Sequence, residues 1–303
     1  MLLEAILLTV ITAATPLLIA ALGELVVERA GVLNLGVEGM MVMGASCGFA
    51  VAIATGSTVL GALAGILAGA VLAAVFALMV LGLAASQVAS GLALTIFGLG
   101  LSGLVGARYV GAQRDPAPKL HIAGLSDLPF IGPVLFGQDG FVYASFVLLL
   151  AVAWFLGRTR AGLTLRAIGE NPASAHALGH KVLRVRLLAI LFGGGCAGLA
   201  GAYLSLGYTP FWVRGMTAGR GWIALALVVF SSWMPGRLAA GAYLFGAVSI
   251  LQLHAQAFNL GIPSQLMSSL PYLATVVVLV AISRTHGRGA GPASLGVPFV
   301  PDH

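Results

Sequence analysis

The sequence predicts an all-α polytopic membrane protein with about nine transmembrane helices. Three observations predict it: 59% of the 303 residues are hydrophobic, only 8% are charged, and the mean hydropathy is +1.04. A soluble domain carries about a quarter charged residues, because solvated side chains must cover its surface. The composition therefore excludes a soluble enzyme, a disordered chain and a disulfide-stabilised scaffold. At roughly 20 residues per span, the length allows about eight to ten helices.

Nine apolar segments are the expected spans, and they are too long and too continuously apolar to be strands of a membrane barrel. They cover residues 4–22, 38–54, 58–83, 87–108, 139–157, 185–207, 220–233, 237–255 and 266–283. Together they define a transmembrane domain over 1–284, followed by a Gly- and Pro-rich tail over 285–303. In the third span, Gly61, Gly65 and Gly69 recur every four residues and predict a smooth face for helix packing.

The positive charges predict the orientation. The stretch 158–186 carries six Lys or Arg residues against one acid, Glu170, and is therefore expected on the cytoplasmic side. The tail then also lies inside, and the Pro- and Gly-rich segment 109–138 lies outside. Nine spans place the N-terminus outside and the C-terminus in the cytoplasm.

One polar segment does not fit among lipid-facing spans. Residues 23–39 read GELVVERAGVLNLGVEG and include Glu24, Glu28, Asn34 and Glu38. Irregular polar backbone at membrane depth is tolerated where it lines a cavity or is buried in protein, and ionisable residues there are functional candidates. We therefore predict a broken or re-entrant segment, with Glu28, Asn34 and Glu38 beside a solute path. An ordinary cytoplasmic loop with a solvated charged face is the alternative.

A second segment repeats this pattern. Residues 214–222 read RGMTAGRGW, are Gly-rich and charged, and lead into an apolar span. In the predicted topology the first segment enters from the inside and the second from the outside, and the span 139–157 separates two sets of four spans. This is the pattern of an inverted repeat, whose interface usually holds the pathway. Gly219 and Arg220 therefore join the predicted path.

The predicted cytoplasmic loop contains a short helix. In RAIGENPASAHALGHKVL (166–183), Asn171 and Pro172 predict a helix start and Gly179 predicts its end. A short exposed helix between two spans has the form of a docking element, although an ordinary loop helix has the same form. His176 and His180 have a metal-compatible spacing, but no third ligand is close in the sequence, so we expect no metal site.

Three stretches, in order along the chain, carry a resemblance to a known family. They read ERAGVLNLGVEGMMVMGA (28–45), IGENPASAHALG (168–179), and GLAGAYLSLGYTPFWVRGMTAGRGWIALALVVF (198–230) followed by IPSQLMSSLPYLATVVVL (262–279). Together they resemble the integral-membrane permeases of bacterial ABC importers for ribose-like sugars and branched-chain amino acids. The closest likeness is to the subgroup that works with nucleoside-binding lipoproteins of the basic membrane protein type. The resemblance spans about residues 1–284, with departures at SSWMPGRL (231–238), His176 and Gly179-His180.

The resemblance implies that energy and solute affinity come from other subunits. It identifies the loop that contacts the ATPase, with these residues in it: Gly169, Glu170, Asn171, Pro172, Ala175 and Gly179. The chain has no G-x-x-x-x-G-K-[ST] phosphate loop, so ATP and Mg²⁺ are expected on a partner subunit. We expect no catalytic, cofactor-binding or metal-ligating residue in this chain.

The resemblance also implies the partners and the membrane. They are an ATPase, with two fused nucleotide-binding halves in the nucleoside subgroup, a second and different permease chain, and an extracytoplasmic or lipid-anchored solute-binding protein. The chain is expected in the cytoplasmic (inner) membrane of a bacterium. No basic run beside aromatic residues predicts nucleic-acid binding.

The leading interpretation is an ABC permease for a small polar solute. The resemblance favours a nucleoside, with a simple sugar as the alternative. An ATP-independent secondary transporter or channel is the alternative of another class, and it has no need of the 168–179 motif. An intramembrane enzyme would need a catalytic constellation in facing spans, and the sequence offers none.

Overall fold

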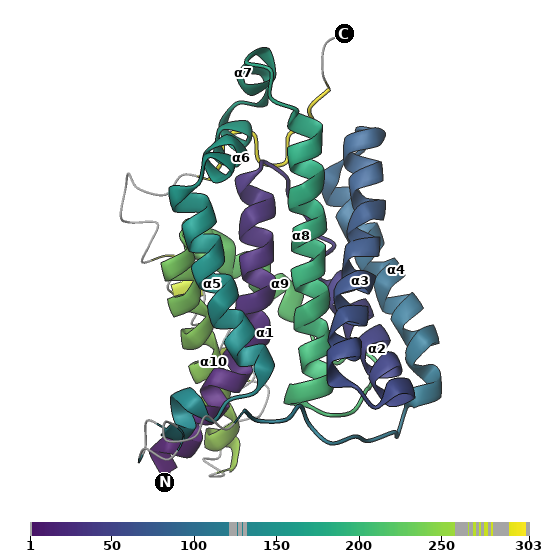
Figure 1. Ribbon diagram of the computed structural model, residues 1–303, viewed down its shortest axis with the longest axis vertical. Coiled ribbons are helices and arrows are strands. Elements are labelled where there is room, and N and C mark those ends of the chain that lie inside the picture. Colours follow the sequence, from purple (N-terminus) through teal and green to yellow (C-terminus); the bar gives the residue numbers. More distant parts are fainter. Residues whose placement is uncertain are drawn as a thin grey trace.

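The computed structural model describes residues 2–120, 126, 129, 132–257 and 291–300, with single positions between 258 and 290. This described part is a bundle of helices that run roughly side by side, with the two chain ends at opposite ends of the bundle (Figure 1). Seven of its helices are long and apolar enough to cross a membrane. The predicted all-α membrane fold is confirmed. The expected last span, 266–283, lies outside the described residues except for single positions.

Seven of the helices correspond to predicted spans. The helices include α1 (Leu2–Arg29), α2 (Val37–Thr55), α3 (Thr58–Ala77) with the π-helical turn η1 (Leu78–Gly82), α4 (Gln87–Gly106), α5 (Gly140–Arg158), α6 (Arg160–Glu170), α7 (Pro172–Ala177), α8 (Val182–Tyr203) with η4 (Leu204–Tyr208), α9 (Arg220–Phe230) and α10 (Pro235–Ala257).

The first span is longer than predicted. α1 continues to Arg29, so Glu24 and Glu28 lie on a regular helix, and only residues 30–36 between α1 and α2 are irregular. The expectation of a broken segment throughout 23–39 was therefore wrong for its first part. Apolar neighbours on every side of the two acids are buried, and this packing extends the helix past them.

The predicted span 220–233 is also corrected. α9 has 11 residues and is about 16 Å long, which is too short to cross a hydrocarbon core of about 30 Å. The helix ends because Ser232 and Trp233 adopt positive φ angles of 51° and 55° just before Pro235. α9 begins at the half-buried Arg220 and the buried Gly221, inside the bundle. This agrees with the predicted break in the second polar segment.

The glycine face predicted on the third span packs as expected. A Cβ atom on Gly69 of α3 would collide with the backbone of Gly194 and Gly198 on α8, and one on Gly65 would collide with the Ala202 Cβ of the same helix. The other face of α3 exposes a stripe of apolar residues, as a helix facing lipid does: Val59, Leu63, Leu67 and Val71.

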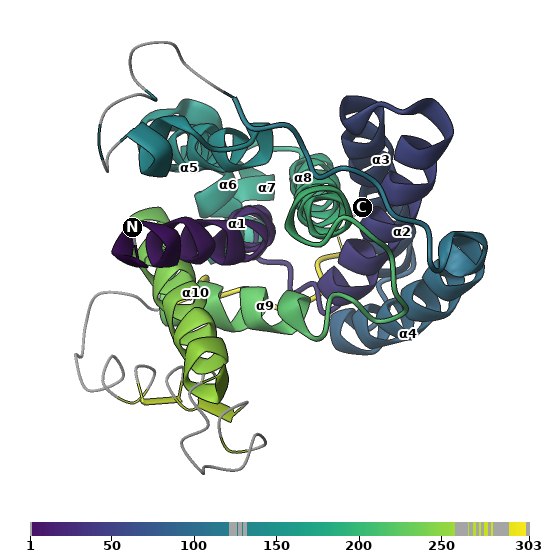
Figure 2. The same cartoon turned by 90° about the horizontal axis from the view of Figure 1, so that it is seen from below.

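The contacts of α1 and α8 follow the same pattern. α1 packs against α8, α9 and α10, and α8 packs against α1, α2 and α3, while α2 touches α9. α1 and α8 run in opposite directions in the centre of the bundle (Figure 1). Seen from below, α9 and α10 lie beside α1, and α2 and α3 lie beside α8 (Figure 2). An inverted repeat requires this arrangement of the six helices, and its fourth pair would need the segment 266–283.

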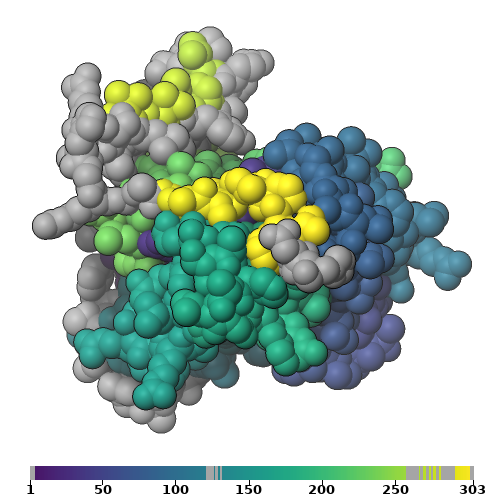
Figure 3. Space-filling model, turned by 90° about the horizontal axis from the view of Figure 1, so that it is seen from above, coloured from purple at the N-terminus to yellow at the C-terminus, as the bar shows by residue number. Residues whose placement is uncertain are grey.

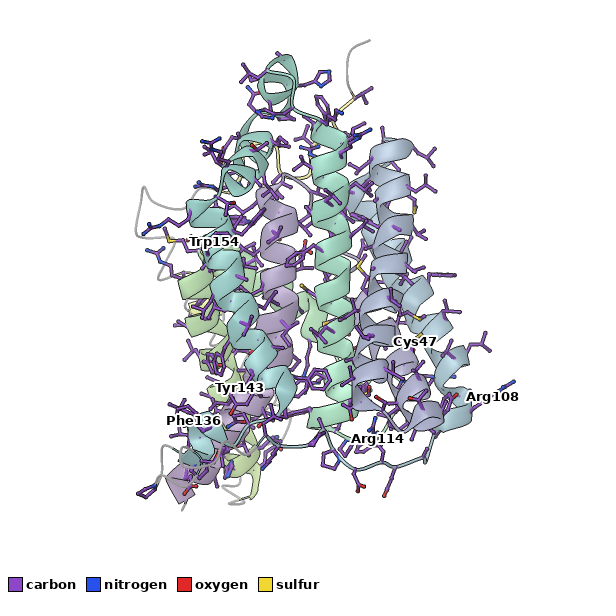
Figure 4. The ribbon with its side chains drawn as sticks, viewed as in Figure 1. Cys47, Arg108, Arg114, Phe136, Tyr143 and Trp154 are labelled. Carbon is purple, nitrogen blue, oxygen red and sulfur yellow. The ribbon has the colours of Figure 1, made fainter. Side chains whose placement is uncertain are left out.

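The two ends of the bundle differ as the charge pattern predicted. Arg108, Arg114, Phe136 and Tyr143 lie at the end that holds the N-terminus (Figure 4). The helices α6 and α7 and the C-terminal segment lie at the opposite end, called here the α7 end (Figure 1). The predicted exterior loop and the predicted cytoplasmic loop are thus on opposite ends.

Candidate functional site

The two polar segments meet inside the bundle at Glu38, in the first turn of α2. Its Oε1 accepts hydrogen bonds from the Thr217 hydroxyl at 2.6 Å and from Gly219 N at 2.9 Å, and its Oε2 accepts one from Gly221 N at 2.6 Å. The carboxylate thus satisfies backbone N–H groups at the start of α9, where the helix dipole favours negative charge. The structure brings together Glu38 and Gly219 of the predicted path.

Arg220, at the start of α9, is half-buried. Its Nη1 donates to the carbonyls of Met216 and Thr217 at 3.2 and 3.3 Å, and its guanidinium carbon lies 5.5 Å from the centre of the Tyr208 ring. Arg220 therefore holds the irregular connection 209–219 to the end of α8.

A second group of acidic side chains, Glu24 and Glu28, lies on the last turns of α1, toward the α7 end. Glu28 Oε2 accepts a hydrogen bond from Trp233 Nε1 at 2.6 Å, and Glu24 Oε1 accepts one from Asn34 N at 3.2 Å. All three polar residues, Glu24, Glu28 and Asn34, are at most 1% exposed. Within the described part of the chain, Glu24 Oε2 and Glu28 Oε1 have no hydrogen-bond partner. Trp233 was missed because its motif stood out only as a departure from the family pattern.

Asn34 shapes the short connection between α1 and α2. Its Oδ1 accepts a hydrogen bond from Gly36 N at 2.9 Å, which forms a local turn just before α2 begins. The connection thus folds back onto α1, and the predicted path residues Glu28 and Asn34 both lie close to Glu24. They form a group separate from the Glu38 contacts.

The loop helix forms as the sequence predicted. Asn171 Oδ1 caps α7 by accepting a hydrogen bond from Ser174 N at 2.9 Å, and Pro172 occupies the first position of the helix. Gly179 has a φ of 85°, which favours glycine where a helix ends. Ala175 faces inward and is 4% exposed, whereas Glu170, Asn171 and Gly179 are exposed.

Gly169 brings this loop against the first polar segment. A Cβ atom there would collide with the Arg29 carbonyl at the end of α1 and come within 3.3 Å of Gly31 N. Arg29 in turn donates through Nη2 to the Trp233 carbonyl at 2.9 Å. The loop, the end of α1 and the turn after α9 therefore form one continuous set of contacts.

The two loop histidines do not share a helical face. α7 ends at Ala177, so His180 lies beyond it, and the His176 ring packs against Phe299 with ring centroids 5.7 Å apart. In residues 2–120, 132–257 and 291–300, no group of three or more His, Cys, Asp or Glu side chains is placed to hold a metal ion.

Comparisons with known proteins point to transport. A family model described as "branched-chain amino acid transport system / permease component" matches residues 6–282. A putative glucose ABC transporter permease protein of Haloferax volcanii is 44% identical, over 94% of each chain. The guanosine ABC transporter permease protein of Bacillus subtilis is 32% identical, over 95% of this chain and 93% of its own. The nucleoside ABC transporter permease protein of Lactococcus lactis is 30% identical, over 94% and 93%. No solved structure matches the chain.

Proposed function

The chain belongs to the family of permease components of the branched-chain amino acid transport type, and from this premise we propose that it forms the solute path of an ATP-driven importer. Members of this family are transport subunits and not enzymes, and they work with an ATPase subunit and a solute-binding protein. The observation that carries the proposal is the α6–α7 loop, with an exposed helix and a buried Gly169 against α1.

The coupling residues are proposed to act through this contact. The exposed side of α7 and Glu170–Pro172 would dock on the ATPase, where ATP and Mg²⁺ are bound. A shift of the loop would press on the end of α1 at Arg29 and Gly31, and then on the turn at Trp233. Packed helices move as rigid bodies, so this displacement would reach α9 and the path.

The path itself is proposed to follow the two polar segments. Gly219 and Arg220 are half-buried, which supports them as lining groups. Glu28, Asn34 and Glu38 are at most 4% exposed and bond to protein groups, which supports a role in holding the wall of the path. Two rigid sets of helices on either side of a fixed site suit alternating access.

The solute is proposed to be a nucleoside or a simple sugar. Two relatives are named for guanosine and nucleosides, which supports the nucleoside. The 44% identity to a putative glucose permease favours the sugar. Uptake of labelled guanosine and labelled glucose by cells with and without this chain, each with the other solute as competitor, decides between them.

The remaining partners are proposals from the resemblance. They are a second and different permease chain and an ATPase with two fused nucleotide-binding halves. The chain would lie in the cytoplasmic membrane with α7 and the C-terminus in the cytoplasm, which the positive charges of 158–186 support.

Replacing Glu170, Asn171 and Pro172 together with Ala tests the function. Uptake should fall to background while the chain still enters the membrane, because the ATPase no longer engages the path. Ala161→Ser, an exposed change at the start of α6 and outside the proposed docking surface, is the matched control. Normal uptake by the triple variant, or full uptake by the purified chain alone in liposomes, would contradict an ATP-driven importer and favour a secondary carrier.

A further inference from the structure

The C-terminal segment 291–300 crosses the α7 end of the molecule. It lies beyond the family match, which ends at residue 282. In a view onto this end it lies, in yellow, between the teal residues of α6 and α7 and the green residues of the α9–α10 region, and one end of it meets the blue residues of α3 and α4 (Figure 3). We call residues 291–300 the strap.

Ser294 joins the strap to the coupling loop. Its N and its Oγ both donate to the Gly169 carbonyl, at 3.0 and 2.7 Å. Next to it, Ala293 N donates to Glu170 Oε2 at 3.3 Å. Ser294 is 7% exposed, so its own two bonds are made away from solvent and their loss leaves buried polar groups unpaired, whereas the bond between Ala293 and Glu170 is exposed. The strap therefore bonds directly to two of the proposed coupling residues.

Arg186, on α8, joins the strap to the bundle. Its Nε donates to the Ala30 carbonyl at 3.1 Å, its Nη1 to the Val297 carbonyl at 3.4 Å and its Nη2 to Ser294 Oγ at 3.1 Å. The side chain is fully buried. One planar guanidinium thus holds the connection after α1 and two points of the strap, a fork that a lysine cannot reproduce.

The two ends of the strap contact α7 and the turn after α9, both of which are proposed to shift during transport. Phe299 packs against His176 of α7 and against the buried residues Ile168, Ala175 and Val182. At the other end, Gly291 lies so close to the Trp233 ring that a Cβ atom would come within 2.6 Å of it. The strap therefore touches α7, the α1–α2 connection and the turn after α9.

We propose that the strap fixes the coupling loop to the helix bundle, and that Arg186 and Ser294 are positioning residues for ATP-driven transport. The proposal rests on the coupling function proposed above. Without the strap, α7 can tilt on its own when the ATPase moves. With it, Gly169 and α8 move together, so the displacement reaches α1 and the turn at Trp233.

The test uses the whole transport complex purified from its native cells and reconstituted in liposomes. The quantity measured is labelled guanosine or glucose imported per ATP hydrolysed. Ser294→Ala and Arg186→Lys should lower this ratio about tenfold, while ATP hydrolysis and complex yield stay as in the wild type. Val300→Ser on the strap and Arg184→Lys on α8 change exposed side chains and serve as matched controls. Both should keep the normal ratio.

The outcomes separate this proposal from the proposed function. If the Glu170–Asn171–Pro172 variant uncouples transport but Ser294→Ala and Arg186→Lys keep the normal ratio, the strap proposal is wrong and the coupling loop stands. If the two strap variants only lower the melting temperature and yield, with an unchanged ratio per assembled complex, the strap is ordinary packing and the proposal is again wrong. If all three leave the ratio unchanged, both proposals fail.

Discussion

Two buried glutamates connect the first two helices to the α9 region, and their hydrogen bonds differ. Glu38 on α2 bonds to the start of α9, and Glu28 on α1 bonds to the turn after α9; these contacts are called here the Glu38 joint and the Glu28 joint. The Glu38 joint is complete: both carboxylate oxygens accept hydrogen bonds, from Thr217, Gly219 and Gly221. The Glu28 joint has one donor, Trp233 Nε1. In the described part of the chain its other oxygen has no partner, and neither does Oε2 of Glu24.

The difference suggests separate tasks for the two joints. A buried polar atom without a partner costs about 1–3 kcal/mol, so the Glu28 joint is not arranged for greatest stability. It also lies beside the coupling loop, because Arg29 bonds to Trp233 and contacts Gly169. We expect the Glu38 joint to stay closed during transport and the Glu28 joint to rearrange.

Glu38→Gln has the largest expected effect. The amide keeps only one accepting oxygen, so a buried N–H at the start of α9 loses its acceptor. Together with the lost negative charge at the helix N-terminus, this costs about 3 kcal/mol of folding free energy. Thermal unfolding of the purified chain in detergent should show a clearly lower melting temperature, and uptake should fall with it. Asp115→Asn, which neutralises an exposed acid, is the control and should leave the melting temperature unchanged.

Trp233→Phe should have an intermediate effect. A smaller aromatic ring remains, and so does the backbone carbonyl that accepts from Arg29, but Glu28 loses its donor and Gly291 loses part of its packing against the indole. The expected cost is about 1–2 kcal/mol, read from the same melting experiment. A loss as large as that of Glu38→Gln would show that the second joint is as stabilising as the first and would remove the contrast between them.

The sequence predicted what depends on local pattern and missed what depends on distant partners. Continuous apolar runs located the seven long helices of the described residues, and Asn171-Pro172 with Gly179 located the loop helix. The continuation of α1 through Glu28 was missed, because the donor to that acid lies 205 positions along the chain. A single sequence carries no mark of such a pairing.

The strap was missed for a related reason. Residues 291–300 have neither helical nor strand periodicity. They contact the bundle through hydrogen bonds of the Ser294 hydroxyl and of the Val297 backbone carbonyl, which no sequence pattern marks. Arg186 was visible only as one of several positive charges that predicted the cytoplasmic side. Its burial and its hydrogen-bond acceptors depend on the tertiary structure, and a count of charges along the sequence does not predict them.

Glu28→Gln should have the smallest effect on stability and gives the sharpest test of the contrast. The amide oxygen can still accept from Trp233 and the shape of the side chain is kept, so the free energy of unfolding should change by less than about 1 kcal/mol in either direction. Uptake should nevertheless fall, because the amide places an N–H₂ donor where Oε1 now has no partner, and so changes the contacts that we expect to rearrange during transport. Unfolding and uptake must therefore be measured on the same preparation. If Glu28→Gln unfolds as easily as Glu38→Gln, the Glu28 joint is a second stabilising contact that stays closed. If it keeps normal stability and normal uptake, the Glu28 joint is not the contact that rearranges during transport.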